Sequence, residues 1–365
     1  FRPIVFEVWD WDRLTSHDFI GKFSTSIDSL LNGKLEYAVI HPEKKKKKAS
    51  YESSGTFVLN VKPERVPIMG PNPELARLRD HKNRLLIAKG IVPQPNPFTF
   101  MEYLAGGCEV SIVFGIDFTS SNGWPEEDYS LHHLHADKMN SYEEAIKAVG
   151  SIVAPYDRDN MFPVFGYGAK IKKTGVFPPV FPINLNEDKP ECFGVDGILQ
   201  EYRKIIPDIT FGDMGTATRP DGKPYYGDDF YQLIEKTMKT IGKGAKQDSQ
   251  KYHILVLIID GDAFDEQSTI DTLVDAEDYP LSIIIIGVGH GSFANSIKFD
   301  ADDEPLKKSD GRVQKRDIVQ FVKFEEYKHS MDQLSAAVLA EVPKQLTTFM
   351  AMKNIFPNQK IHVTL

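Results

Sequence analysis

Cysteine is scarce in this sequence, which has only Cys108 and Cys192 among its 365 residues. Two cysteines cannot complete a zinc site of the Cys₄ or Cys₃His type, and they make a poor disulfide framework. The hydrophobic content of 41% and the charged content of 26% are ordinary for a globular protein. We therefore expect a cytoplasmic protein that works in a reducing environment.

Long apolar runs and an excess of positive charge are also missing. No stretch of about 18 consecutive apolar residues occurs, so we expect no membrane-spanning helix. The formal net charge is -9, whereas a nucleic-acid-binding domain is usually basic. The sequence therefore argues against general nucleic-acid binding.

The first part of the chain has the pattern of β-strands separated by turns. The segment IVFEVWDWD alternates, SHDFIGKFSTSI follows it, and SSGTFVLNVK begins with a turn and continues as a strand. A β-sandwich needs on the order of 100 residues, which is more than residues 1–64 supply. We therefore predict the second half of an antiparallel sandwich, whose first half would precede Phe1.

A change in composition separates this part from the rest. Proline-rich segments, PERVPIMGPNPE and VPQPNP, flank a short basic helical stretch, which is typical of a linker. We assign residues 65–97 to this linker. We then predict one domain over residues 98–352 and a C-terminal tail over residues 353–365.

Apolar strands and amphipathic helices alternate in the predicted domain. Strands are expected at VSIVFGID, MFPVFGYGA, HILVLIIDG, LSIIIIGVG and DIVQFVKF. Helices are expected at residues 141–154, 195–206, 228–241, 270–274 and 331–350, the last broken or bent by Pro343. Ser141 and Glu144 would form a capping box for the first helix. This alternation predicts an α/β fold, with a mostly parallel, doubly wound sheet and helices on both faces.

Acids and hydroxyls cluster where two of these strands end. Asp117 and Asp260 each follow a long apolar run, and Thr119 and Ser121 follow Asp117 directly. Ligands bind outside the carboxyl ends of strands in such sheets. Acid and hydroxyl oxygens suit Mg²⁺, Mn²⁺ or Ca²⁺, and Thr216, in a loop before a helix, could join them. Alternatively, the hydroxyls cap a helix and Asp260 begins an Asp-Gly turn.

The segment DFTSS resembles the Asp-x-Thr/Ser-x-Ser signature of von Willebrand A-type domains, which carry a metal-ion-dependent adhesion site. GIDFTSSNG, MFPVFGYGAKI, SIIIIGVG, RDIVQFVKF and LAEVPKQL resemble, in order, the copine family over residues 98–350. The resemblance implies a site for Mg²⁺ or Mn²⁺. Its ligands would be Asp117, Thr119, Ser121, Thr216 and Asp260, with Thr218 as the alternative to Thr216. It also implies protein partners that bind the ion, through an acidic residue.

Three aspartates lie close together in the first module. Asp10, Asp12 and Asp18 fall in one loop, where flexible carboxylate ligands suit Ca²⁺. A solvated acidic turn is the alternative. The pattern, with the Phe-Ile-Gly that follows, resembles the third calcium loop of C2 domains. That class needs further aspartates from an earlier loop, so we expect weak calcium binding or none from this fragment.

A run of five lysines follows in the same module: Lys44, Lys45, Lys46, Lys47 and Lys48. Such a run is usually a solvated loop. In a calcium-dependent lipid-binding module it could also contact anionic headgroups, at about 1 kcal/mol per residue.

Other motifs are weaker. The segment GVGHG lacks the remaining features of a dinucleotide-binding loop. The histidines of LHHLH, His132, His133 and His135, have no partners at a metal-site spacing and are expected in a surface loop.

The resemblance therefore implies a copine-like adaptor that is not an enzyme. It would bind acidic phospholipids with calcium, move from the cytoplasm to the plasma membrane or other membranes when calcium rises, and recruit protein partners. The alternative is a metal-dependent hydrolase at the same strand ends, with Asp262 or Asp265 as the general base.

Overall fold

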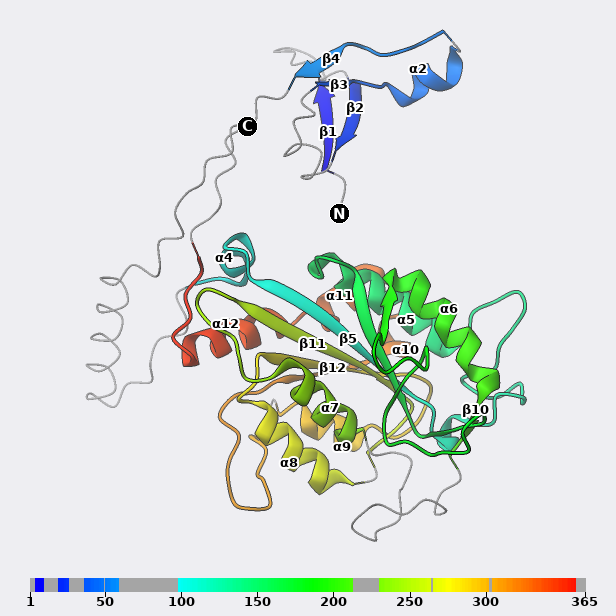
Figure 1. The fold of residues 1–365 in the computed structure, drawn as a ribbon, viewed down its shortest axis with the longest axis vertical. Coiled ribbons are helices and arrows are strands. Elements are labelled where there is room, and N and C mark those ends of the chain that lie inside the picture. Colours follow the sequence, from blue (N-terminus) through cyan, green and yellow to red (C-terminus); the bar gives the residue numbers. More distant parts are fainter. Residues whose placement is uncertain are drawn as a thin grey trace, which may run out of the picture. The chain divides into compact units, whose positions relative to one another are not determined.

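The structure is a computed structural model. It describes residues 4–9, 19–25, 36–48, 50–58, 98–212, 230–263, 265–301 and 304–358. The chain divides into two compact units, and their described parts lie within residues 4–58 and 98–358 (Figure 1). The predicted linker lies outside the described residues, and the predicted domain limits stay predictions.

The front unit is built from short antiparallel strands. β1 (Ile4–Trp9) pairs with β2 (Phe19–Thr25), and β3 (Glu36–Ala38) pairs with β4 (Thr56–Val58). Phe23 and Tyr37 are buried between these strands, and their rings stack with centroids 4.9 Å apart. The antiparallel arrangement agrees with the prediction.

The lysine run departs from the prediction of a loop. Residues Pro42–Lys47 form the short helix α2, in which all the lysines are exposed. Pro42 stands in the first turn, where a proline costs no hydrogen bond. His41 precedes it, and its side chain accepts a hydrogen bond from the Lys44 amide. The run is solvated as expected, but these start signals make it helical.

The rear unit contains one large sheet in the order β13-β12-β11-β5-β6-β8, with β9 also paired to β6. The strands are β5 (Glu109–Asp117), β6 (Met161–Tyr167), β8 (Phe181–Pro182), β9 (Glu191–Phe193), β11 (Lys251–Ile259), β12 (Leu281–Gly287) and β13 (Val319–Lys323). All pairs among β13, β12, β11, β5 and β6 are parallel, whereas β8 and β9 pair antiparallel with β6. A separate antiparallel pair joins β7 (Ala169–Ile171) to β10 (Ile209–Phe211). The prediction of a mostly parallel sheet is confirmed.

Helices cover both faces of this sheet (Figure 1). One core contains residues of α5 (Ser141–Val153), α6 (Gly194–Ile205), α10 (Phe324–Tyr327) and α11 (Met331–Val338). The other contains residues of α7 (Tyr231–Ile241), α8 (Glu266–Ala276) and α9 (Ala294–Phe299). Along β11, Val256 belongs to the first core and Leu257 to the second. A strand buried on both faces must be apolar throughout, which explains the continuous runs in the sequence.

A third cluster closes the end of the sheet where β5 and β11 begin. It joins α4 (Phe100–Ala105) and α12 (Val342–Met352) through Tyr103, Tyr252 and Phe349. This cluster leaves the opposite edge, where β5 and β11 end, available for a site.

Two helix boundaries refine the sequence prediction. The capping box of α5 is formed by Asn140 and Glu143, not by Ser141 and Glu144. The helix therefore starts one residue after an asparagine, which is an equally good cap. The last predicted helix is indeed broken: α11 ends at Val338, and Pro343 stands in the first turn of α12.

Candidate metal centre

The two strand-end aspartates meet at one edge of the sheet. β5 and β11 are parallel neighbours, and Ile116 pairs with Ile258. Asp117 and Asp260 therefore leave the sheet at the same edge, as the sequence predicted. Both are buried, with 4% and 8% of their surfaces exposed.

The backbone amide of Thr119 and the hydroxyls of Thr119 and Ser121 connect the two aspartates. The Thr119 amide donates to Asp117 Oδ1 at 2.8 Å, and Thr119 Oγ1 lies 2.8 Å from Ser121 Oγ. Ser121 Oγ then donates to Asp260 Oδ1 at 3.0 Å. The structure thus brings four of the five predicted residues together, and Thr216, like Thr218, lies outside the described residues.

The helix-capping alternative does not account for these hydroxyls. Thr119 holds the N-cap position of a 3₁₀ turn, η1 (Ser120–Asn122), yet its side chain makes no capping hydrogen bond among the described residues. Ser121 lies inside the turn and bonds across to the end of another strand. Both hydroxyls therefore take part in the connection between the two aspartates, and Thr119 Oγ1 also accepts a hydrogen bond from Asn122 Nδ2 at 3.3 Å.

A cavity of about 360 Å³ opens beside this chain. Its lining residues are Asp117, Ser121, Leu131, Tyr167, Phe230, Asp260, Gly261, Asp262, His290, Gly291 and Ser292. Within the described part of the chain, this lining contains three aspartates and no lysine or arginine. Burial raises the pKa of Asp260, and the hydrogen bond from Ser121 opposes that rise. A cation bound in the cavity would favour the charged carboxylates.

The donor set fits a hard divalent cation. The available atoms are carboxylate and hydroxyl oxygens, which Mg²⁺ and Mn²⁺ prefer. Within the described residues, no three His, Cys, Asp or Glu side chains form a group that could hold a metal ion. An ion here would therefore depend on the hydroxyls as well as on the two aspartates.

Two glycines allow the chain to approach the site closely. A Cβ on Gly168, whose φ is +80°, would lie 2.5 Å from Thr119 Cγ2. A Cβ on Gly291 would lie 2.0 Å from the Asp260 carbonyl oxygen. Gly291 belongs to the GVGHG segment, so this segment positions Asp260. In the sequence, the glycines at the end of a predicted strand indicate a close approach of the backbone, but nothing there links them to Asp260.

His132 contradicts the prediction of a surface loop. Its ring is fully buried, with Nε2 2.8 Å from the Asp117 carbonyl oxygen and Nδ1 2.7 Å from the Tyr202 hydroxyl. Burial lowers its pKa to about 3, so the ring is neutral near pH 7. Because a carbonyl can only accept, Nε2–H donates to Asp117 and Nδ1 accepts from Tyr202. Leu131 and Leu134 pack against the core on either side and carry the histidine inward.

The acids considered for a general base have other partners. Asp262 accepts hydrogen bonds from Ser292 Oγ and the Asn295 amide, both at 2.6 Å. Asp265 caps α8 by accepting from the amide and hydroxyl of Ser268. Asp265 also does not line the cavity as far as the structure describes it.

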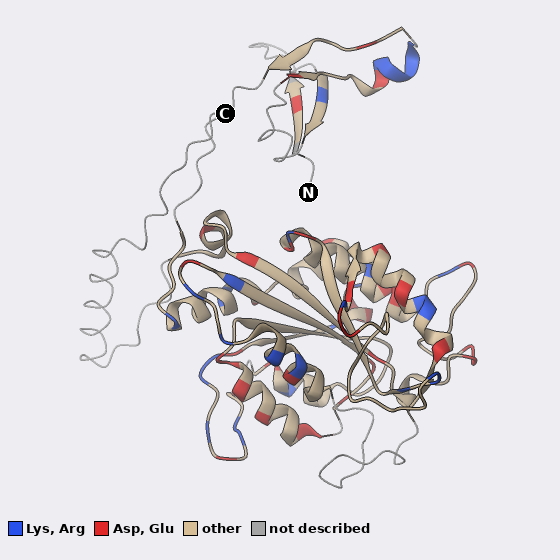
Figure 2. Cartoon of the chain, in the orientation of Figure 1, with Lys and Arg blue, Asp and Glu red and all other residues tan. Residues whose placement is uncertain are grey.

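The front-module acids cannot be placed, since Asp10, Asp12 and Asp18 lie outside the described residues. The lysines of α2 are described and form a basic stretch on that helix (Figure 2). As for membrane insertion, the helices that the structure describes include none with the length and apolarity to cross a bilayer.

Comparisons with known proteins give the family of the chain. Residues 130–358 match the sequence model of the family described as Copine, and residues 1–41 match that of the C2 domain. Copine-E of Dictyostelium discoideum is 36% identical over 362 residues, which are 99% of this chain and 54% of that protein. Copine-A of the same organism is 34% identical over 98% of this chain and 52% of its own length. The chain thus spans about half the length of these relatives.

Solved structures with some likeness include a manganese-loaded Plasmodium vivax TRAP protein, at a TM-score of 0.37 and 11% identity over 63% of this chain and 75% of that one. Another is proximal thread matrix protein 1 from the mussel byssus, with a zinc-occupied MIDAS motif, at a TM-score of 0.34 and 15% identity over 66% of this chain and 48% of that one. The family assignment rests on the sequence matches: the chain belongs to the copine family.

Proposed function

We propose that this chain acts as an adaptor that binds acidic membranes with calcium and recruits protein partners through a divalent ion. The observation that carries the second half of the proposal is the hydrogen-bonded chain from Asp117 through Thr119 and Ser121 to Asp260. It opens onto a cavity lined by carboxylates. Membership of the copine family and the match to the C2 domain support the first half.

The residues of the rear unit suit different roles at the ion. Thr119 and Ser121, with Thr216, would ligate Mg²⁺ or Mn²⁺ directly, and Asp117 and Asp260 would hold waters on it. Neutral hydroxyl ligands leave the ion with most of its positive charge. That charge, held beside the buried Asp117 and Asp260, would attract an acidic residue of a partner protein.

The front unit would supply the membrane contact. Asp10, Asp12 and Asp18 would bind Ca²⁺ weakly on their own, because this class of domain also uses aspartates from an earlier loop, and the lysines of α2 would approach anionic headgroups. A rise in calcium would then move the protein from the cytoplasm to the plasma membrane or other membranes. The partners would arrive with it.

A hydrolytic role has less support. It needs a general base within hydrogen-bond reach of a water at the metal. Asp262 and Asp265 already accept hydrogen bonds that hold the loops after β11 and β12. We therefore propose a binding function, not an enzymatic one.

Calorimetric titration of Mn²⁺ and Mg²⁺ into the 365-residue chain tests the ion site. We expect saturable binding by the parent, a loss of at least about tenfold in affinity for Thr119→Ala, and no measurable binding at this site for Asp260→Asn. Thr240→Ala is the control, because Thr240 is an exposed threonine on α7 whose hydroxyl donates to the Lys236 carbonyl of the same helix.

All variants have the same front unit, so any ion that it binds contributes equally to each titration. Differences between variants therefore report on the rear-unit site. Unchanged Mn²⁺ affinity in Thr119→Ala would contradict the proposed ligand set. A folded parent that binds neither ion would contradict the metal-centred surface altogether.

A further inference from the structure

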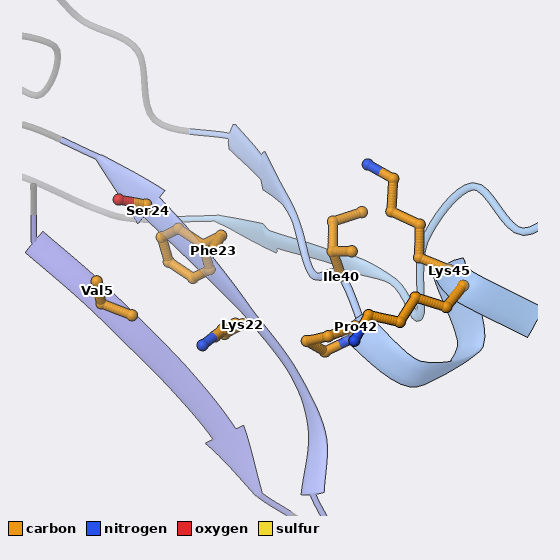
Figure 3. Close-up of a pocket in the computed structure, with 8 residues that line it drawn as sticks. Val5, Lys22, Phe23, Ser24, Ile40, Pro42 and Lys45 are labelled. Carbon is orange, nitrogen blue, oxygen red and sulfur yellow. The ribbon is translucent and has the colours of Figure 1, made fainter. Parts of the chain in front are cut away.

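A groove of about 550 Å³ lies in the front unit (Figure 3). Its walls come from β1, β2, the segment after β3, and α2. The lining residues are Val5, Lys22, Phe23, Ser24, Ile40, Pro42, Lys45 and Lys46. All of them are described, and neither the copine nor the C2 match assigns them a role.

Apart from the buried Phe23, the apolar part of the groove comes from the outer face of the strands. Phe6 turns inward and stacks on Phe23, with ring centroids 4.8 Å apart. Its neighbour Val5 therefore points outward, and 54% of its surface is exposed. Ile40 is held beside the strands by two backbone hydrogen bonds with Lys22, and Pro42 begins α2 next to it. Val5, Ile40 and Pro42 thus form a small apolar wall beside the lysines.

The charged part is entirely basic along the described lining. Lys22 of β2 and Lys45 of α2 line it (Figure 3), and so does Lys46 of α2. Glu43 approaches Lys46 to 3.5 Å, but both side chains are more than half exposed, so this pair holds the lysine weakly. Glu7 lies opposite Lys22 in the strand register without lining the groove.

We propose that this groove binds the phosphate of an anionic phospholipid headgroup. Three lysines supply charges suited to a phosphate, because each carries a compact ammonium group on a flexible stem. Val5, Ile40 and Pro42 would contact the glycerol and the first acyl carbons. A free, hydrated phosphate would gain nothing from that apolar wall, so the combination favours a lipid in a membrane. The aspartates play no part, and this contact forms without calcium.

This inference deepens the proposed membrane function and rests on it. It also limits the basic site to Lys22, Lys45 and Lys46, in place of the whole lysine run. Lys44, Lys47 and Lys48 belong to the same run but do not line the groove in the described structure. They provide a control of equal charge.

The test is sedimentation of the full chain with phosphatidylcholine vesicles that contain phosphatidylserine, with excess EGTA and, separately, with calcium. Two triple variants are compared with the parent. The groove variant carries Lys22→Gln, Lys45→Gln and Lys46→Gln; the control variant carries Lys44→Gln, Lys47→Gln and Lys48→Gln. In EGTA we expect the groove variant to lose at least about tenfold more affinity than the control, since only its lysines line the groove in the described structure. Equal losses would overturn the proposal, because they would indicate diffuse attraction by the whole run.

Two further measurements identify the source of the phosphate. Val5→Ser should weaken vesicle binding about threefold, by removing apolar contact at an exposed position. Soluble glycerophosphoserine should compete poorly with vesicles. Full competition, with no effect of Val5→Ser, would make this a site for a free phosphate ester and overturn the lipid assignment. The calcium arm reports separately on the proposed function, which fails if calcium adds no binding, whatever the lysine variants do.

Discussion

Gly291 has no side chain, and this allows the loop after β12 to lie against Asp260. A Cβ on Gly291 would lie 2.0 Å from the Asp260 carbonyl oxygen, far inside van der Waals contact, and the obstructing atom is backbone. The two loops must separate if any side chain is present. The position of the Asp260 carboxylate therefore depends on a residue that supplies no side chain to the site.

We predict that Gly291→Ala lowers Mn²⁺ affinity by at least about tenfold and destabilises the fold by about 1–3 kcal/mol, which is typical of overpacking. Gly261→Ala is the control, since it lines the same cavity and its Cβ would meet only an ordinary contact at 3.7 Å. Calorimetry gives the affinity, and urea unfolding gives the stability. Equal Mn²⁺ affinity in the two variants would show that the close approach does not position Asp260.

At this scale, the sequence was informative about residues that act through type and local spacing. Asp117, Thr119 and Ser121 follow one apolar strand and were placed correctly at its end. His132 was placed wrongly, because its burial depends on Tyr202, 70 residues away in the chain. A contact of that range leaves no local pattern. Gly291 was recognised only as part of a glycine-rich segment for the same reason.

The start of α5 connects this helix to the site through one side chain. Asn140 caps the helix by accepting from the Glu143 amide at 2.9 Å. Its amide group donates to the His133 carbonyl and to the Tyr202 hydroxyl. Tyr202 in turn bonds the ring that holds the Asp117 carbonyl. The cap is therefore buried and shared between elements, unlike most helix caps.

We predict that Asn140→Ala lowers the free energy of unfolding by about 2 kcal/mol, at the upper end for the loss of a helix cap, because buried donors also lose their partners. Ser330→Ala, at the exposed N-cap of α11, should cost about 0.5–1 kcal/mol. Urea denaturation of both variants measures the difference. Similar costs would indicate that the Tyr202 and His133 contacts of Asn140 contribute little.

Element prediction succeeded where a segment is long and periodic. The five central strands and helices α5, α6, α7, α8 and α11–α12 follow from their apolar patterns. The pairs β7–β10 and β8–β6 were not predicted, because strands of two or three residues have no measurable alternation and exist through their partners. The predicted N-cap of α5, Ser141, is one residue away from the observed N-cap, Asn140, because both residue types are good caps.

Across the rear unit, apolar clusters seal both faces and one end of the sheet, and the remaining edge carries the polar groups. This division explains why the alternation of apolar strands and amphipathic helices in the sequence was enough to predict the architecture. It also means that ionisable groups within the sheet are enclosed by apolar layers. His253, on the central strand β11, is such a group, with 9% of its surface exposed.

Burial, with a contribution from the charge of Lys251, lowers the pKa of His253 to about 4. In the unfolded chain its pKa is about 6.5, so below that pH the unfolded state binds a proton that the native state does not. The stabilising effect of the neutral ring is complete above pH 6.5 and is lost as the pH falls towards 4. We predict that the free energy of unfolding of the parent falls by about 2 kcal/mol more than that of His253→Gln between about pH 7.5 and pH 5. Urea unfolding followed by circular dichroism at both pH values measures this difference, and the other acids and histidines titrate alike in both proteins. Parallel pH dependences would show that the native sheet admits a charged His253, and hence that its apolar layers open more readily than their packing indicates.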